Sequence, residues 1–109
     1  KKDYPKAELY FEKSTELYKK DENLYYNLGE LYMNSNKTAK AIEAFKAAVA
    51  LNAGWETPLA KLGYAYLGAG KMAEAVSVFE KYVTQFPEGK DKRDIAAMLP
   101  ELKKMVPKK

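Results

Sequence analysis

Apolar side chains recur along the chain at the spacing of a helix, and the same sets return after 34 positions, as between positions 7, 41 and 75. An alanine followed four residues later by a phenylalanine occurs three times at this interval: Ala7 with Phe11, Ala41 with Phe45, and Ala75 with Phe79. A second set also recurs: Leu28, Gly29 and Tyr32 return as Leu62, Gly63 and Tyr66. Side chains at positions i, i+3, i+4 and i+7 share one helix face, so the pattern predicts amphipathic helices. The fixed period predicts that these helices form stacked repeat units.

Breaks in the pattern divide the chain into six predicted helices. Asn34-Ser35-Asn36 and Gly68-Ala69-Gly70 interrupt it with residues that favour turns. We expect helices over residues 4–18, 22–34, 38–51, 56–68, 72–85 and 90–106, with the last bent or restarted at Pro100. One domain would span residues 1–109. It would contain the second helix of an incomplete pair (4–18), two complete units (22–54 and 56–89), and a capping helix with a basic tail (90–109).

Two glycines lie inside predicted helices rather than at their ends. Gly29 and Gly63 occupy equivalent places in the two complete units. A glycine in mid-helix costs about 1 kcal/mol relative to alanine. We therefore expect a neighbouring helix to approach the backbone closely at both positions.

The repeated residues carry a family resemblance. Tyr25-x-x-Leu28-Gly29-x-x-Tyr32, followed by Ala41-x-x-x-Phe45, resembles the tetratricopeptide-repeat pattern of W-x₂-L-G-x₂-Y, A-x₃-F and a closing proline. Tyr25 and Leu59 replace the tryptophan, and Ala53 replaces the first closing proline. The residues that match or stand in for the signature are Ala7, Phe11, Tyr25, Leu28, Gly29, Tyr32, Ala41, Phe45, Leu59, Leu62, Gly63, Tyr66, Ala75, Phe79 and Pro87. The resemblance implies an all-α solenoid of antiparallel helix pairs with a C-terminal capping helix.

Members of this family usually bind ligands in a concave groove lined by the first helix of each pair. The groove positions that the resemblance implies here are Asn23, Tyr26, Glu30, Met33, Asn34, Thr57, Ala60, Tyr64, Leu67, Asp94 and Met98. Their aromatic and apolar character favours an extended or helical peptide of a partner protein. Chaperone-binding members hold a terminal carboxylate with cationic groove residues, whereas the equivalent places here carry Tyr26, Glu30, Ala60 and Tyr64. We therefore expect this chain not to form a carboxylate clamp.

Composition argues against several other functions. The 109 residues contain no cysteine and no histidine, so most nucleophilic, acid–base and metal-binding templates lack a principal member. We expect no enzyme activity, no cofactor and no metal site. The net charge of +4 arises at the ends, where Lys1, Lys2, Lys103, Lys104, Lys108 and Lys109 supply six of the 19 basic residues. The other 13 basic residues are outnumbered by the 15 acidic residues of the chain. This balance does not favour nucleic-acid binding.

Two alternative functions remain open at this stage. The apolar face of residues 4–18, with Ala7, Phe11 and Leu17, lacks an upstream helix, so the chain could form a homodimer through it. The basic segment from Lys90 carries an apolar stripe that could instead lie on an anionic membrane surface, although docking on the preceding helix is the simpler arrangement. The start at Lys1 without methionine or signal peptide suggests a fragment of a longer protein. A cytoplasmic location is our working guess, and a periplasmic one is compatible.

Overall fold

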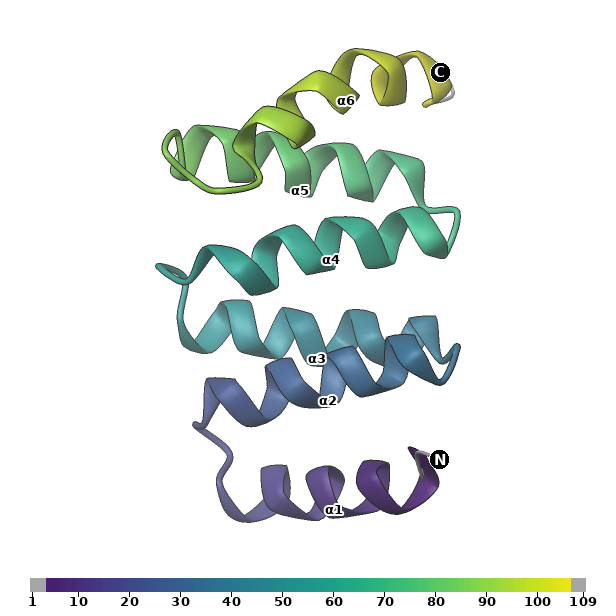
Figure 1. The fold of residues 1–109 in the computed structure, drawn as a ribbon, viewed down its shortest axis with the longest axis vertical. Helices are drawn as coiled ribbons and strands as arrows, with labels where there is room; N and C mark the ends of the chain where they lie inside the picture. The colour runs from purple at the N-terminus through teal and green to yellow at the C-terminus, as the bar shows by residue number, and fades with distance from the viewer. Residues whose placement is uncertain (1–3, 107–109) are drawn as a thin grey trace.

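The computed structural model describes residues 4–106 as a stack of six helices without a strand in that range. Consecutive helices lie side by side and alternate in direction, with α1 and α6 at the two ends of the stack (Figure 1). The helices are α1 (Tyr4–Leu17), α2 (Glu22–Asn34), α3 (Thr38–Leu51), α4 (Glu56–Gly68), α5 (Met72–Gln85) and α6 (Lys92–Met105). The predicted all-α repeat architecture is confirmed. None of these six helices is both long and apolar enough to cross a bilayer.

The turns inside the two complete pairs use the same backbone conformation. Asn36 has φ 62° and Gly70 has φ 76°, and they occupy equivalent positions of the repeat (70 − 36 = 34). Glycine and asparagine tolerate this left-handed region better than other residues do. These two residues therefore allow the chain to reverse direction after α2 and after α4.

A phenylalanine ring lies over a glycine within each complete pair. A Cβ atom at Gly29 would come within 2.6 Å of the Phe45 ring, and one at Gly63 within 2.3 Å of the Phe79 ring. Both phenylalanines are fully buried. The glycines thus permit the close approach of α2 to α3 and of α4 to α5, and they mark the two points where the core is tightest.

Helix α6 closes the C-terminal end of the stack. Ile95, Leu99 and Leu102 are buried in one cluster with residues of α5, and Met98 packs against the same cluster. The helix runs through Pro100 as one continuous element, so the expected restart at this proline is wrong. Residues 107–109, including Lys108 and Lys109 of the predicted basic tail, lie outside the described part, as do residues 1–3.

A buried tyrosine holds the connection between α5 and α6. The Tyr82 hydroxyl donates a hydrogen bond to the Glu56 carboxylate and accepts one from the Asp91 N–H at 3.1 Å. Glu56 also accepts a hydrogen bond from the Lys90 N–H at 3.0 Å. A Cβ atom at Gly89 would lie 2.5 Å from the Tyr82 hydroxyl oxygen, so glycine lets the loop pass close to this network. Tyr82 stands where the previous unit has Ala48, and the bonds it adds fix the start of the capping helix.

Replacing Tyr82 with phenylalanine is expected to lower the free energy of unfolding by about 1–2 kcal/mol, because the Asp91 N–H loses its acceptor and Glu56 loses a donor. Burial, with the Glu56 hydrogen bond, raises the pKa of Tyr82 from 10.0 to about 12. A raised folded-state pKa gives stability that is complete below pH 10 and is lost as the pH rises toward 12. Urea denaturation at pH 7 and above pH 10 measures both effects. Tyr18→Phe, at an exposed tyrosine, should change neither.

Candidate functional site

The predicted groove residues lie on α2 and α4, the first helices of the two complete units, and on α6. We call this the first-helix surface. Its members are Asn23, Tyr26, Glu30, Met33, Asn34, Thr57, Tyr64, Leu67, Asp94 and Met98. Ala60, which we expected among them, is only 2% exposed and belongs to the core cluster around α5. The small Ala60 side chain is covered by packing, so it offers no surface to a partner.

An aromatic and ionic cluster joins α2 to α4 on this surface. The Tyr26 hydroxyl donates to the Glu30 carboxylate at 2.7 Å, and Lys61 approaches the same carboxylate at 3.3 Å. The Tyr26 ring lies 5.1 Å from the Trp55 ring and 5.9 Å from the Phe45 ring, measured between centroids. Burial, together with the bond to Glu30, raises the pKa of Tyr26. Tyr26 and Glu30 are therefore already engaged within the fold.

Tyr64 is the aromatic side chain of this surface that stays available. Its ring stands edge-on against Phe79 at 5.2 Å between centroids, and the residue is 36% exposed. Within residues 4–106 its hydroxyl has no hydrogen-bond partner. Burial, followed by the negative charges of Asp91 and Asp94, raises the pKa of Tyr64. This tyrosine therefore keeps its proton at neutral pH and can both donate and accept a hydrogen bond.

The remaining side chains of the first-helix surface differ in how far they are exposed to solvent. Asn23, Asn34 and Asp94 are exposed polar residues, and Thr57 is half-buried. The apolar members Met33, Leu67 and Met98 are half-buried because each packs against a core cluster. The surface thus combines a partly covered apolar floor with polar edges.

Two residues of this surface were missed by the sequence reading. Trp55 precedes α4 and packs on Tyr26, and Lys61 pairs with Glu30. Both lie outside the positions that the resemblance assigned to the groove. The single tryptophan of the chain, in the connection between two units, was the signal that could have drawn attention to Trp55.

A separate cavity of about 450 Å³ lies between α2 and α3. Its lining residues are Tyr25, Leu28, Tyr32, Ala39, Lys40, Glu43 and Ala44. Three of them are repeat-signature residues, for which we expected only packing roles. In the next unit Val78 stands in place of Ala44 (78 − 44 = 34), so the smaller side chain leaves more room here.

The chain matches one known protein family and several solved structures. The tetratricopeptide-repeat model matches residues 1–55 and again residues 26–90. No curated protein sequence matches the chain significantly. The second TPR domain of human RPAP3, solved with the HSP70 peptide SGPTIEEVD, has a TM-score of 0.77 at 22% identity, covering 92% of this chain and 81% of that one. The first TPR of Spaghetti (RPAP3), bound to the HSP90 peptide SRMEEVD, has a TM-score of 0.75 at 22% identity, with 94% and 80% covered.

A crystal structure of MamA is also similar, with a TM-score of 0.80 at 24% identity. The match covers 94% of this chain but 56% of MamA, so this chain corresponds to about half of that protein. At these identities the likeness concerns the fold.

Proposed function

Because the chain belongs to the tetratricopeptide-repeat family, we propose that it is a protein-interaction module whose first-helix surface binds a peptide of a partner protein. Tyr64 is the observation that carries this proposal. It is partly exposed, its hydroxyl is unpaired within the described chain, and its ring is held edge-on against Phe79. Tyrosine is a favoured anchor of interfaces because it buries a large area with little loss of rotamer entropy. No catalytic role is proposed for any residue.

The proposed ligand differs from the acidic, carboxylate-ended peptides of the RPAP3 complexes. Lys61 lies beside the carboxylate that Tyr26 binds, and Glu30 already pairs with it at 3.3 Å. Asp94 adds a negative charge at the edge formed by α6. A carboxylate brought to Tyr26 would meet the Glu30 carboxylate and a lysine that is already paired with it. We therefore propose that apolar, uncharged or basic peptides are preferred.

The proposal gives a direct expectation for the peptide SGPTIEEVD. Titrated against this chain up to about 1 mM, it should show no saturable binding beside Tyr26, because Lys61 is already paired with Glu30 there. Trp55 lies on the surface beside Tyr26, so its fluorescence reports binding there. Saturable binding of SGPTIEEVD that is lost in Lys61→Ala would instead establish a carboxylate-binding site.

The peptide-binding function itself can be tested with a displayed library of random 12-residue peptides selected on this chain. Tyr64→Ala should weaken binding of the selected peptides by about tenfold or more, as truncation of an interface anchor does. Tyr18→Ala is the matched control, because Tyr18 is an exposed tyrosine in the connection that follows α1. Equal binding to the wild type and to Tyr64→Ala would rule out this surface as the site.

The alternative that the basic C-terminal segment lies on a membrane surface depends on an exposed apolar stripe. The apolar stripe it requires is turned toward α5, where Ile95, Leu99 and Leu102 are buried. Met105 is the member of the stripe that stays largely exposed, at 61%. A bilayer would have to displace this packing to reach the stripe, so we propose that α6 acts as a cap.

A further inference from the structure

The cavity between α2 and α3 combines an apolar lining with charges at its edge. Of its lining residues, Leu28, Tyr32 and Ala44 are buried. Lys40 and Glu43 also line it and are exposed to solvent. Its volume of about 450 Å³ lies within the range of about 300–1,000 Å³ that small-molecule sites commonly have. The cavity is therefore large enough for a ligand with an apolar body and few polar groups.

The cavity does not continue along the stack. A second cavity, of about 230 Å³, includes Tyr66 and Glu74 of the next unit. Ala39 and Glu43 of α3 line both cavities, so this helix stands between them. An extended peptide needs a continuous track of contacts along a surface. The local shape of the cavity therefore favours a small molecule as its occupant.

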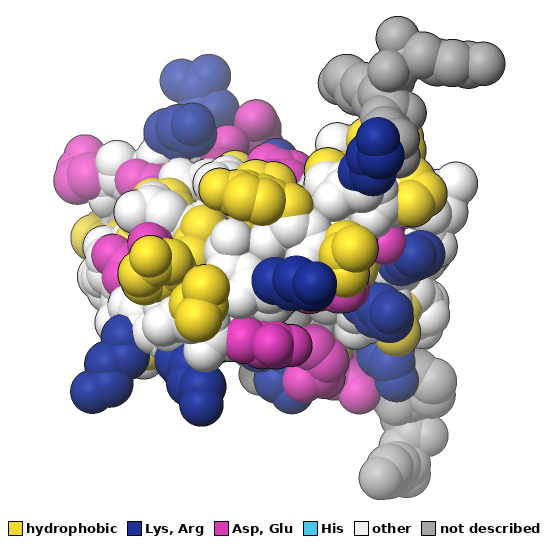
Figure 2. Space-filling model, turned by 90° about the horizontal axis from the view of Figure 1, so that it is seen from below, with side chains coloured by type: hydrophobic (Ala, Val, Ile, Leu, Met, Phe, Trp, Pro, Cys, Tyr) yellow, Lys and Arg dark blue, Asp and Glu magenta, His cyan; other side chains and the backbone are white. Residues whose placement is uncertain are grey.

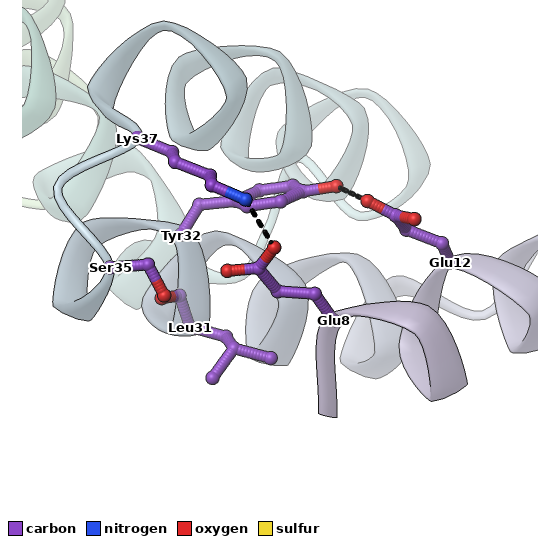
Figure 3. Close-up of polar contacts among 6 residues, drawn as sticks. All are labelled: Glu8, Glu12, Leu31, Tyr32, Ser35 and Lys37. Atoms are coloured by element: carbon purple, nitrogen blue, oxygen red, sulfur yellow. Dashed lines mark hydrogen bonds and ion pairs between the residues drawn. The ribbon is translucent and has the colours of Figure 1, made fainter. Parts of the chain in front are cut away.

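The Tyr32 side chain, which lines the cavity, is held in place by α1. Its hydroxyl donates a hydrogen bond to the Glu12 carboxylate (Figure 3). In the same view, Lys37 in the turn before α3 donates a hydrogen bond to Glu8 at 2.6 Å. These contacts fix α1, α2 and the start of α3 relative to one another. The cavity is thus formed before a ligand arrives, so binding requires little ordering of the chain.

Lys40 is the charged residue of this cavity that lacks an ionic partner. Its ammonium nitrogen lies 5.6 Å from the centroid of the Tyr32 ring, and within residues 4–106 it forms no ion pair. Glu43, by contrast, is paired with Lys46 at 3.8 Å. Tyr25 adds a half-buried side chain whose hydroxyl forms no hydrogen bond in the same range. The charge left unpaired at the cavity is therefore positive, which is complementary to an anionic ligand.

We propose that this cavity binds a small amphipathic anion, with an aromatic or branched aliphatic body between α2 and α3 and its anionic group at Lys40. The next unit has Glu74 and Val78 in place of Lys40 and Ala44, so it lacks both the positive charge and part of the space. The cavity shares no residue with the first-helix surface. The proposed peptide site and this site can therefore fail separately.

Two fluorescent probes with the same aromatic body test the role of charge. Anilinonaphthalene sulfonate carries an anionic group, and phenylnaphthylamine lacks it. We expect the sulfonate to bind the wild-type chain with a Kd on the order of 0.1 mM. Lys40→Glu should weaken this binding at least about fivefold and change the affinity for phenylnaphthylamine less than about twofold. An unchanged affinity for the sulfonate, or no saturable binding up to about 1 mM, would overturn the proposal.

The Lys40→Glu variant is expected to fold, because Lys40 is exposed and the next unit carries Glu74 at the equivalent position. Lys81→Glu is the matched control, since Lys81 is an exposed lysine of α5 and does not line the cavity. It should change the affinity for either probe less than about twofold. An equal loss of sulfonate binding in both variants would show that only the net charge of the chain matters, and the site would then be wrong.

Filling the cavity tests the place of the apolar body. Ala44→Leu should weaken binding of both probes at least about fivefold, because the larger side chain takes up space between α2 and α3. Ala50→Leu, at an exposed alanine of the same helix, should leave both affinities within about twofold of the wild type. Circular dichroism confirms that each variant is helical. Undiminished binding of both probes to folded Ala44→Leu contradicts the proposal.

Exposed apolar side chains of α1 are the competing site for an apolar probe, among them Leu9, Tyr10 and Leu17. Figure 2 looks at this end of the stack and shows hydrophobic side chains at the surface, interspersed with lysines and acidic residues. Backbone amide NMR signals of the wild-type chain, followed during titration with the sulfonate, separate the two sites without any substitution. Shifts should concentrate at residues 25–32 and 39–44. Shifts concentrated at residues 9–18 would mean that the probe binds on α1 and that the cavity is not the site.

Discussion

Phe79→Ala is expected to lower the free energy of unfolding by about 3–5 kcal/mol, whereas Phe11→Ala should cost no more than about 2 kcal/mol. Both residues stand at the same position of the repeat, 68 residues apart (79 − 11). Phe79 is fully buried over Gly63, while Phe11 is half-buried at the edge of the core cluster that contains Tyr32. The difference in cost therefore measures what a covering helix contributes to one side chain.

Urea denaturation followed by circular dichroism gives both values, and Phe45→Ala provides an internal check. Phe45 is also fully buried over a glycine, so its replacement should cost as much as that of Phe79. Equal losses for Phe11→Ala and Phe79→Ala would mean that Phe11 is fully covered in solution.

Glu8→Ala is expected to lower the free energy of unfolding at pH 7 by about 2 kcal/mol, because the charge-assisted hydrogen bond from Lys37 is lost. Glu8 is only 5% exposed, so no water replaces this donor fully in the folded chain. Glu16→Ala, at an exposed glutamate of the same helix, should change stability by less than about 0.5 kcal/mol. Chemical denaturation at pH 7 compares the two variants directly.

The hydrogen bond between Lys37 and Glu8 also predicts how the free energy of unfolding changes in acid. The hydrogen bond from Lys37 lowers the pKa of Glu8 below its ordinary value of 4.5. A depressed folded-state pKa gives stability that is complete above pH 4.5 and is lost as the pH falls through the folded value. Glu8→Ala should therefore lose less stability than the wild type between pH 5 and pH 3. An identical acid dependence in both proteins would show that Glu8 is not the titrating group.

Isoleucine at position 8 separates the packing contribution from the charge. The equivalent residues are Ile42 in α3 and Val76 in α5, both buried. The Lys37 side chain is 46% exposed and can return to water when its partner is removed. Glu8→Ile should therefore be more stable at pH 7 than Glu8→Ala, since replacing a buried ion pair by apolar packing is often neutral or better.

The repeat architecture was predictable because its signal lies in the spacing of residues. Gly29, Phe45 and their equivalents act through backbone geometry and ring packing, which recur wherever the residue types recur. Pro100 was harder to judge, since the effect of a proline depends on whether packing holds the helix on both sides. Here Leu99 and Leu102 are buried on either side of it, and the helix continues.

The candidate site was less accessible from the sequence than the fold. The residues of the first-helix surface followed from the resemblance, but their availability did not. Tyr26 and Tyr64 look alike in sequence, yet the hydroxyl of Tyr26 is bonded to Glu30 and that of Tyr64 is unpaired within the described chain. Tyr26 has Glu30 four residues later, whereas Tyr64 has Gly68 at that place. Tyr26 also packs on Trp55, which lies in the connection before α4. Such contacts between units are not encoded in a single-unit motif.

Within residues 4–106, the most extensive contacts are those between helices that follow one another in the chain. Contacts of this local kind require little loop closure before they form, so the chain should fold quickly for its length. They also allow one end to open while the rest stays intact. Helices α1 and α6 each have one packed neighbour, but α1 buries two polar residues whereas α6 buries three apolar ones. The amides of α1 should therefore exchange with solvent before those of α4 and α5, and the stack would come apart from its N-terminal end.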